Sequence, residues 1–82
     1  TLARILGPCG VCVNAIAPGL TATESALQQT GKEAFEATIA VQCIKRREEP
    51  EDLEGTVVFL ASSASDFITG QVIIVDGGAL LP

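Results

Sequence analysis

Two short runs rich in apolar residues predict strands over 11–17 and 71–75. Neither run alternates apolar with polar residues, which is typical of strands buried on both faces of a sheet. Asn14 is the one strongly polar side chain of the first run, which ends at Pro18-Gly19, and Asp76-Gly-Gly78 ends the second. The runs lie far apart in the sequence and lack polar alternation. The pattern therefore favours a parallel pair joined by a helical crossover.

Apolar residues at helical spacing predict a helix before each strand, at 1–6 and at 50–62. In both helices the apolar positions lie three or four residues apart: Leu2, Ile5 and Leu6 in the first, and Leu53, Val57 and Leu60 in the second. Pro50 suits the first helical position, and the acidic residues beside it suit the helix dipole. The segment 1–6 is expected to be the tail of a helix, ended by Gly7-Pro8.

The segment 21–47 holds most of the polar residues of the chain and the weakest core signal. Two capping boxes, Thr21 with Glu24 and Thr30 with Glu33, predict two helix starts within it. A helical pair with so little apolar surface is expected to be a mobile flap.

Composition changes the picture of how much of a domain is present. The chain has 82 residues, of which 48% are hydrophobic, and it begins with Thr1. Strands buried on both faces need helices on both sides, and so short a chain cannot supply those layers. We therefore expect an α/β fold that is one end of a doubly wound parallel sheet, with two strands and crossover helices, incomplete as a domain.

Charge and hydropathy exclude some partners. The net charge is −5, and the largest basic cluster is Lys45-Arg46-Arg47, so a nucleic-acid partner is not expected. This cluster is expected to be a solvated turn paired with Glu48 and Glu49, with Arg46 in a structural role. No apolar run approaches the ~20 residues that span a bilayer, so no membrane partner is expected.

Three cysteines, Cys9, Cys12 and Cys43, are an odd number that suits a reducing compartment, so the expected location is the cytoplasm. A redox Cys-x-x-Cys pair lies at a helix N-terminus, whereas Cys9 and Cys12 run into a strand. Structural zinc takes four Cys or His ligands, and the chain has no His. Neither a redox nor a metal site is expected.

Five blocks of sequence resemble, in the same order, the C-terminal part of a short-chain dehydrogenase/reductase. The blocks are 10–19 (GVCVNAIAPG), 49–52 (EPED), 59–62 (FLAS), 68–71 (ITGQ) and 75–78 (VDGG). The resemblance implies that residues 1–82 are one segment of a Rossmann-type domain. It also implies an NAD(P)-dependent oxidoreductase that interconverts alcohols with ketones or aldehydes by hydride transfer. The competing interpretation is a small non-catalytic α/β module for assembly.

The chain also departs from the family pattern. The glycine-rich phosphate loop and the Tyr-x-x-x-Lys pair with its serine are absent, and the chain holds no Tyr. No catalytic residue is therefore expected here, and NAD or NADP would be bound mainly by polypeptide outside this sequence. The family often has Gly where Lys45 and Glu48 stand. It commonly has bulky or basic side chains where Cys9 and Cys12 stand.

The candidate cofactor site follows the first strand directly. Ligands in open α/β sheets bind beyond the carboxyl ends of strands, and a glycine allows close approach of a flat ring. The residues alone also fit a plain strand-to-helix turn with a capping Thr. The resemblance implies that this loop lines the nicotinamide pocket, that the backbone near Leu20 and Thr21 binds the carboxamide, and that Thr23 contacts the carboxamide or phosphate. The expected cofactor-binding residues are Pro18, Gly19, Leu20, Thr21 and Thr23.

The remaining expectations concern packing and partners. The resemblance implies that 21–47 covers a small alcohol or carbonyl substrate, with Phe35, Ile39 and Cys43 as candidates to face it. It also implies a homo-oligomer, a dimer or tetramer, that uses the last strand and the helix before it. The apolar tail 79–82 would dock on another surface. Asn14 is expected to find hydrogen-bond partners, and the side chain of Asp76 to cap the following turn.

Overall fold

The structure, a computed structural model, describes residues 1–81 and has two strands that pair in parallel. Its elements in chain order are α1 (Leu2–Leu6), the 3-10 helix η1 (Gly7–Cys9), β1 (Ala15–Pro18), α2 (Glu24–Gln29), α3 (Lys32–Val41), α4 (Glu51–Ala61), the 3-10 helix η2 (Ser63–Ser65) and β2 (Val72–Val75). Ala15 lies opposite Val72, and Pro18 lies opposite Val75. Helices α2 to α4 connect the strands, so the predicted parallel α/β arrangement is confirmed.

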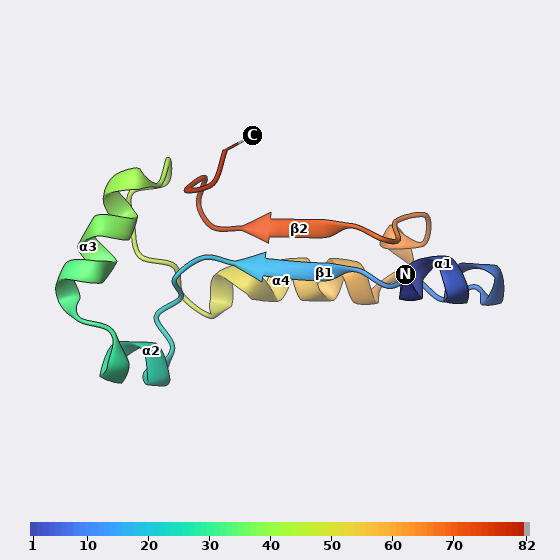
Figure 1. The fold of residues 1–82 in the computed structure, drawn as a ribbon, viewed down its shortest axis with the longest axis horizontal. Coiled ribbons are helices and arrows are strands. Elements are labelled where there is room, and N and C mark those ends of the chain that lie inside the picture. Colours follow the sequence, from blue (N-terminus) through green and yellow to red (C-terminus); the bar gives the residue numbers. More distant parts are fainter. Residues whose placement is uncertain (82) are drawn as a thin grey trace.

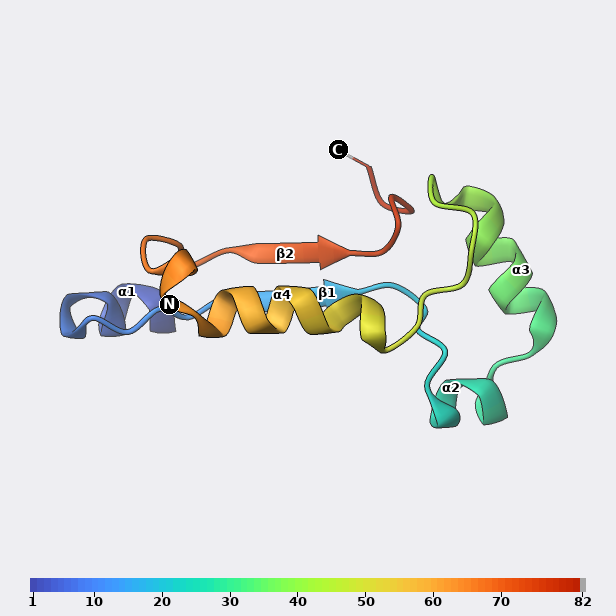
Figure 2. The same cartoon turned by 180° about the vertical axis from the view of Figure 1, so that it is seen from behind.

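The helices divide between the sheet and its ends (Figure 1). Both strands point toward α2 and α3, which lie beyond the carboxyl ends of the strands, whereas α1 lies beyond the opposite ends. Helix α4 runs along one face of the sheet, and Figure 2 shows it in front of the strands from behind. Helices α2 and α3, which belong to the predicted flap, therefore stand where ligands bind in sheets of this kind.

The first strand is shorter than the predicted 11–17, because residues 11–14 bond to a loop and not to β2. The Val13 N–H donates to Thr69 Oγ1 at 2.9 Å. The Asn14 amide donates to the Ile68 carbonyl at 3.0 Å and accepts the Gln71 N–H at 3.0 Å. The expected packing role of Asn14 is confirmed. Because its side chain accepts the Gln71 N–H, β2 begins at Val72 rather than at the predicted residue 71.

Both predicted capping boxes are wrong. Thr23, not Thr21, is the N-cap of α2, and its Oγ1 accepts the Ala26 N–H at 3.1 Å. Gly31 precedes α3 without a side-chain cap, and Thr30 ends α2. The reason lies in tertiary structure, because the segment at Thr21 stays extended to form a bridge to the chain before α4.

Helix α4 begins one residue later than predicted, at Glu51, although Pro50 already has helical torsions of φ −53° and ψ −33°. The Asp52 carboxylate accepts the Glu49 N–H at 2.8 Å, which satisfies one free donor at the helix start. The acidic first turn also suits the helix dipole. This carboxylate is held by Arg46, as described below.

The described residues form little core of their own. Only two apolar side chains are buried, Ala22 and Phe35, while many large apolar side chains lie exposed, and Phe67 is fully exposed. An apolar chain with so little buried surface is not a complete domain, as predicted. No helix among residues 1–81 has the length and apolar character needed to cross a membrane. Pro82, the last residue of the predicted apolar tail, lies outside the described residues.

Candidate functional site

The loop Pro18–Thr21 leaves β1 at the carboxyl ends of both strands. The Gly19 N–H donates to the Val75 carbonyl at 3.1 Å, which extends the strand pairing by one residue. The Thr21 hydroxyl then donates to the Gly19 carbonyl at 3.0 Å. These two bonds fix the path of the loop. Pro18 is exposed, while Gly19, Leu20 and Thr21 are half-buried.

Gly19 is crowded on its inner side. A Cβ atom built on Gly19 would lie 2.9 Å from Glu48 Oε1 and 3.0 Å from Asp76 Cβ, closer than real Cβ contacts. The sequence predicts that Gly19 lets a flat ring approach the loop. The structure adds a second reason for glycine, which is the close packing of Glu48 and Asp76 beneath the loop.

The far end of the loop is joined to residues 42–48, which lead from the predicted flap helices back toward α4 and are called the flap return below. Thr21 and Glu48 form an isolated parallel bridge, and the Ala22 N–H donates to the Glu48 carbonyl at 2.7 Å. Ala22 is buried at this junction. Thr23 follows, exposed, with its oxygen accepting the Ala26 N–H. The Thr23 hydroxyl can therefore cap α2 and still donate its hydrogen outward.

Glu48 lies inside the protein, which corrects the expectation of a surface ion pair. It is only 6% exposed, and neither carboxylate oxygen has a hydrogen-bond partner among the described residues. Burial raises the pKa of the Glu48 carboxyl. The nearby Gly19 N–H and Thr21 hydroxyl oppose this rise, and the negative charges of Asp52 and Asp76 add to it. The sequence marked this position as unusual, because Glu48 stands where the family often has glycine.

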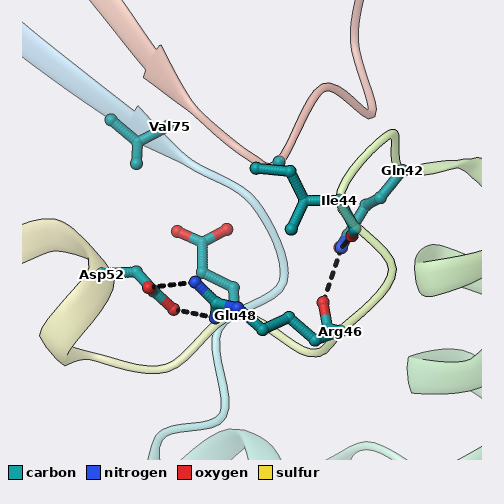
Figure 3. A pocket seen from close by; sticks show the side chains of 7 residues that line it. Gln42, Ile44, Arg46, Glu48, Asp52 and Val75 are labelled. Atoms are coloured by element: carbon teal, nitrogen blue, oxygen red, sulfur yellow. Dashed lines mark hydrogen bonds and ion pairs between the residues drawn. The ribbon is translucent and has the colours of Figure 1, made fainter.

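The Glu48 carboxylate points into a cavity of about 180 Å³ (Figure 3). The cavity lies beside the carboxyl end of β2. Its lining residues come from the flap return, α4 and β2 with the turn after it: Gln42, Ile44, Arg46, Glu48, Asp52, Val75 and Gly77. In Figure 3 the carboxylate points between Val75 and Ile44, away from the nearby Arg46–Asp52 pair.

Arg46 and Asp52 form a bidentate pair below this cavity. Arg46 Nη1 and Nη2 donate to the two Asp52 oxygens at 2.7 and 2.6 Å. The guanidinium, together with the Glu49 N–H, lowers the pKa of Asp52 from 3.8 to about 2. The structure therefore gives Arg46 the structural role expected of it, although its partner is Asp52 and not Glu48 or Glu49.

The rest of the basic cluster is held by surface contacts. Arg47 Nε donates to Glu49 Oε1 at 2.8 Å, as expected. Lys45 pairs with no acidic side chain among residues 1–81, and its Nζ donates to the Ala40 carbonyl at 2.7 Å at the end of α3. A cation at a helix C-terminus is favourable for the helix dipole.

Gln42, which the sequence reasoning missed, holds the flap return in shape. It is 3% exposed, and its Nε2 donates to the carbonyls of Ile44 and Arg46 at 2.9 and 2.8 Å. The N–H groups of Cys43 and Ile44 both donate to the Gly77 carbonyl at 2.9 Å. The flap return is therefore bonded to the turn after β2. The sequence could not predict this burial, because Gln42 lies in a polar segment whose side chains are expected to face solvent.

The turn after β2 is held by Asp76, as predicted. Its Oδ1 accepts the Gly78 N–H at 3.0 Å, and its Oδ2 accepts the Leu80 N–H at 2.9 Å. Gly77 and Gly78 have φ values of +66° and +81°, which favour glycine. Asp76 thus shapes the turn that contacts both Gly19 and the flap return.

The three residues expected to face a substrate lie in different surroundings. Phe35 is buried and Ile39 half-buried on α3, and both line a cavity of about 340 Å³ between the two flap helices and Arg47. Cys43 is exposed, and its Sγ donates to the Gly78 carbonyl at 3.5 Å. All three cysteines are free thiols, and residues 1–81 hold no group of three potential metal ligands.

Comparisons with known proteins match nearly the whole chain. A family model described as enoyl-(acyl carrier protein) reductase matches residues 1–79. The short-chain dehydrogenase/reductase eriH of Hericium erinaceus is 44% identical over 78 residues, which are 95% of this chain and 31% of that protein. The chain thus spans about a third of the length of this curated relative.

Solved structures agree in fold and in sequence. The angucycline C-6 ketoreductase LanV with bound NADP has a TM-score of 0.86 and 37% identity, covering 99% of this chain and 31% of that one. A 3-oxoacyl-[acyl-carrier protein] reductase of Brucella melitensis with bound NAD has a TM-score of 0.85 and 32% identity, covering 99% and 28%. With the parallel α/β arrangement and the five collinear blocks, these matches show that the chain belongs to the short-chain dehydrogenase/reductase family.

Proposed function

We propose that these residues form one wall of the nicotinamide site of a longer NAD(P)-dependent oxidoreductase. The parent enzyme would transfer a hydride between the cofactor and an alcohol or carbonyl substrate. The observation that carries the proposal is the loop Pro18–Thr21, fixed at the carboxyl ends of two parallel strands in a chain whose relatives are oxidoreductases. The matched structures with bound NADP and NAD support the choice of cofactor.

In this proposal the loop binds the cofactor through its backbone. Gly19 would present a flat surface to the nicotinamide ring, and Pro18 would fix the direction of the chain before it. The backbone of Leu20 and Thr21 would hydrogen-bond the carboxamide. Thr23, which lies exposed at the start of α2, would donate its hydroxyl to the carboxamide or to phosphate.

The flap would exclude water from the substrate. Helices α2 and α3 stand beyond the strand ends, and their base is held by Gln42 and by the Gly77 carbonyl. A segment with little core that is bonded only at its base can open at modest cost. Phe35, Ile39 and Cys43 remain our candidates for substrate contact. The catalytic Ser, Tyr and Lys of the family would come from polypeptide outside these 82 residues.

The exposed apolar residues suggest partners for this segment. Val57 and Val58 on α4 and Val72 and Ile74 on β2 are all exposed in residues 1–81. Such surface is expected to pack against the rest of the domain and, in a homo-oligomer, against a second subunit. Three free thiols fit a cytoplasmic enzyme.

The test uses the longer protein that carries this segment. Oxidation of NADPH and of NADH would be followed by absorbance with a panel of ketones and aldehydes, and binding of each cofactor by its fluorescence. We expect binding of at least one cofactor and turnover of at least one carbonyl. A pure, folded protein that binds neither cofactor would contradict the proposal.

A further inference from the structure

Glu48 is an unusual group to find beneath the candidate cofactor loop. Its side chain is more than nine-tenths buried, both carboxylate oxygens lack a partner within residues 1–81, and it points into the cavity of about 180 Å³. An ionised carboxylate is stable inside a protein only when donors or cations satisfy its oxygens. The nearest donors, the Gly19 N–H and the Thr21 hydroxyl, already donate to the Val75 and Gly19 carbonyls, so the surroundings of Glu48 favour the neutral acid.

Two acidic groups near Glu48 act in the same direction as burial. Asp52 faces it from α4, and Asp76 faces it from the turn after β2. Arg46 lines the same cavity and attracts the ionised carboxylate, but two of its nitrogens are already committed to Asp52. Asp52 and Asp76 repel an ionised Glu48, and the charge of Arg46 is already largely balanced by Asp52. Burial, the largest cause, raises its pKa accordingly.

Glu48 is also coupled physically to the loop. Its carbonyl accepts the Ala22 N–H, its backbone bridges Thr21, and its Oε1 lies 2.9 Å from the position that a Cβ of Gly19 would take. If the carboxyl ionises, it must leave the cavity for water. Residue 48 cannot then keep both its backbone bond to Ala22 and its contact beneath Gly19. The protonation of one side chain is thereby linked to the shape of the loop.

We propose that Glu48 is a positioning residue that, as the neutral acid, supports Gly19 and holds the loop Pro18–Thr21 in its cofactor-binding shape. The inference rests on the proposed function, since it assigns a role to a residue through the nicotinamide loop. On loss of its proton to water, Glu48 withdraws its support and the affinity for cofactor falls. Glu48 touches the loop and not the cofactor, so it acts on binding and not on hydride transfer.

The test titrates the longer protein with NADPH and NADH by fluorescence over a pH range from about 5 to about 9. Wild type is compared with Glu48→Gln, which keeps the shape and stays neutral, and with Glu48→Ala, which empties the space. Glu54→Gln is the matched control, since Glu54 is exposed on α4 and its side chain makes no hydrogen bond or ion pair with the other described residues.

We expect the dissociation constant of wild type and of the control to rise about fivefold or more as pH increases, the lower end of ordinary coupling between sites. Glu48→Gln should bind tightly with no such rise, and Glu48→Ala should bind more weakly at every pH. The turnover number should change less than KM for the cofactor. A wild type and a Glu48→Gln variant with the same pH dependence would overturn the inference.

A second measurement separates this inference from the proposed function. The infrared difference spectrum between wild type and Glu48→Gln reports the protonated carboxyl directly, without cofactor. Its presence at neutral pH, with loss at higher pH, supports the neutral acid, and its absence at neutral pH overturns it. A protein that binds no cofactor contradicts the proposed function and with it the role of Glu48 in binding. A protein that binds cofactor with flat pH dependence contradicts only the inference.

Discussion

Arg46 and Asp52 join the end of the flap return to the first turn of α4 by two parallel hydrogen bonds of 2.7 and 2.6 Å. The same carboxylate accepts the Glu49 N–H, so one side chain fixes both the helix start and the approach to it. The geometry is bidentate, which a lysine cannot reproduce. Stability of this corner should therefore depend on the charge of Asp52.

The first prediction concerns acid stability. Because the folded pKa of Asp52 is lowered from 3.8 to about 2, the unfolded state binds more protons between these values. The contribution of Asp52 is thus complete above about pH 4 and lost as pH falls through about 2. Urea unfolding of the longer protein should show less loss of stability on acidification in Asp52→Asn than in wild type. Arg46→Lys should lower stability at neutral pH, and equal pH profiles for all three proteins would contradict the prediction.

The second prediction concerns Gly19. Gly19→Ala places a Cβ atom at 2.9 Å from Glu48 Oε1 and 3.0 Å from Asp76 Cβ, so the loop must shift. We expect weaker cofactor binding, measured by NAD(P)H fluorescence. Gly55→Ala is the matched control, because no described atom lies within 4 Å of its Cβ. Within α4 this control should stabilise the protein by up to about 1 kcal/mol. Equal affinity in both variants would show that the packing beneath Gly19 is unimportant.

The third prediction separates two roles of Thr23. Thr23→Val removes the cap of α2 and should cost about 1 kcal/mol of stability. Thr23→Asp keeps a capping oxygen but brings a negative charge and no hydroxyl donor. It should retain stability while losing affinity for NADPH, whose phosphates it would repel. Unfolding and cofactor titration are measured side by side. If Thr23→Asp binds cofactor as well as wild type, Thr23 is only a cap.

The fourth prediction concerns Gln42. Gln42→Ala removes the side-chain donor to the carbonyls of Ile44 and Arg46, at a cost of about 1–3 kcal/mol, although the Ile44 carbonyl keeps its bond from the Arg46 N–H. We expect faster hydrogen exchange of the amides from 42 to 48 and a raised KM for substrate. Gln28→Ala, on the exposed surface of α2, serves as the control and should change neither quantity. Unchanged exchange in Gln42→Ala would show that other contacts hold the flap return.

The fifth prediction concerns the 82 residues alone. Ala22 and Phe35 are the only buried apolar residues in the described range 1–81, so the isolated peptide should unfold without a cooperative transition in circular dichroism. It should show no NAD(P)H oxidation with carbonyl substrates. A sharp transition in a monodisperse sample would instead favour the competing interpretation of a stable assembly module.

Some features of the fold follow directly from local sequence. The runs at 11–17 and 71–75 predict a parallel pair because they lack polar alternation, and Asp76 with two glycines predicts the turn that follows. Asn14 was expected to need partners, and it has them. In each case the residue types themselves set the requirement, even though the partners of Asn14, Ile68 and Gln71, lie 54 and 57 residues away.

Other features depend on contacts between distant segments. The cap of α2 is Thr23 and not Thr21, because the bridge to Glu48 keeps Thr21 extended. Glu48 lies among charged residues that read as a surface turn, and only the fold places its side chain beneath Gly19. Gln42 likewise becomes buried through the turn at Gly77. The candidate loop could be located from the sequence, whereas the residues that support it could not.

The bond from the Ala22 N–H to the Glu48 carbonyl has a consequence for evolution and for design. That contact brings positions 22 and 48 together. The polypeptide between them is therefore an insertion whose two ends meet at the end of the sheet. The entropic cost of bringing the ends of such an insertion together grows only slowly with its length. The helices between these points can therefore be lengthened, shortened or exchanged with those of a relative, while the strands that carry the loop stay in register.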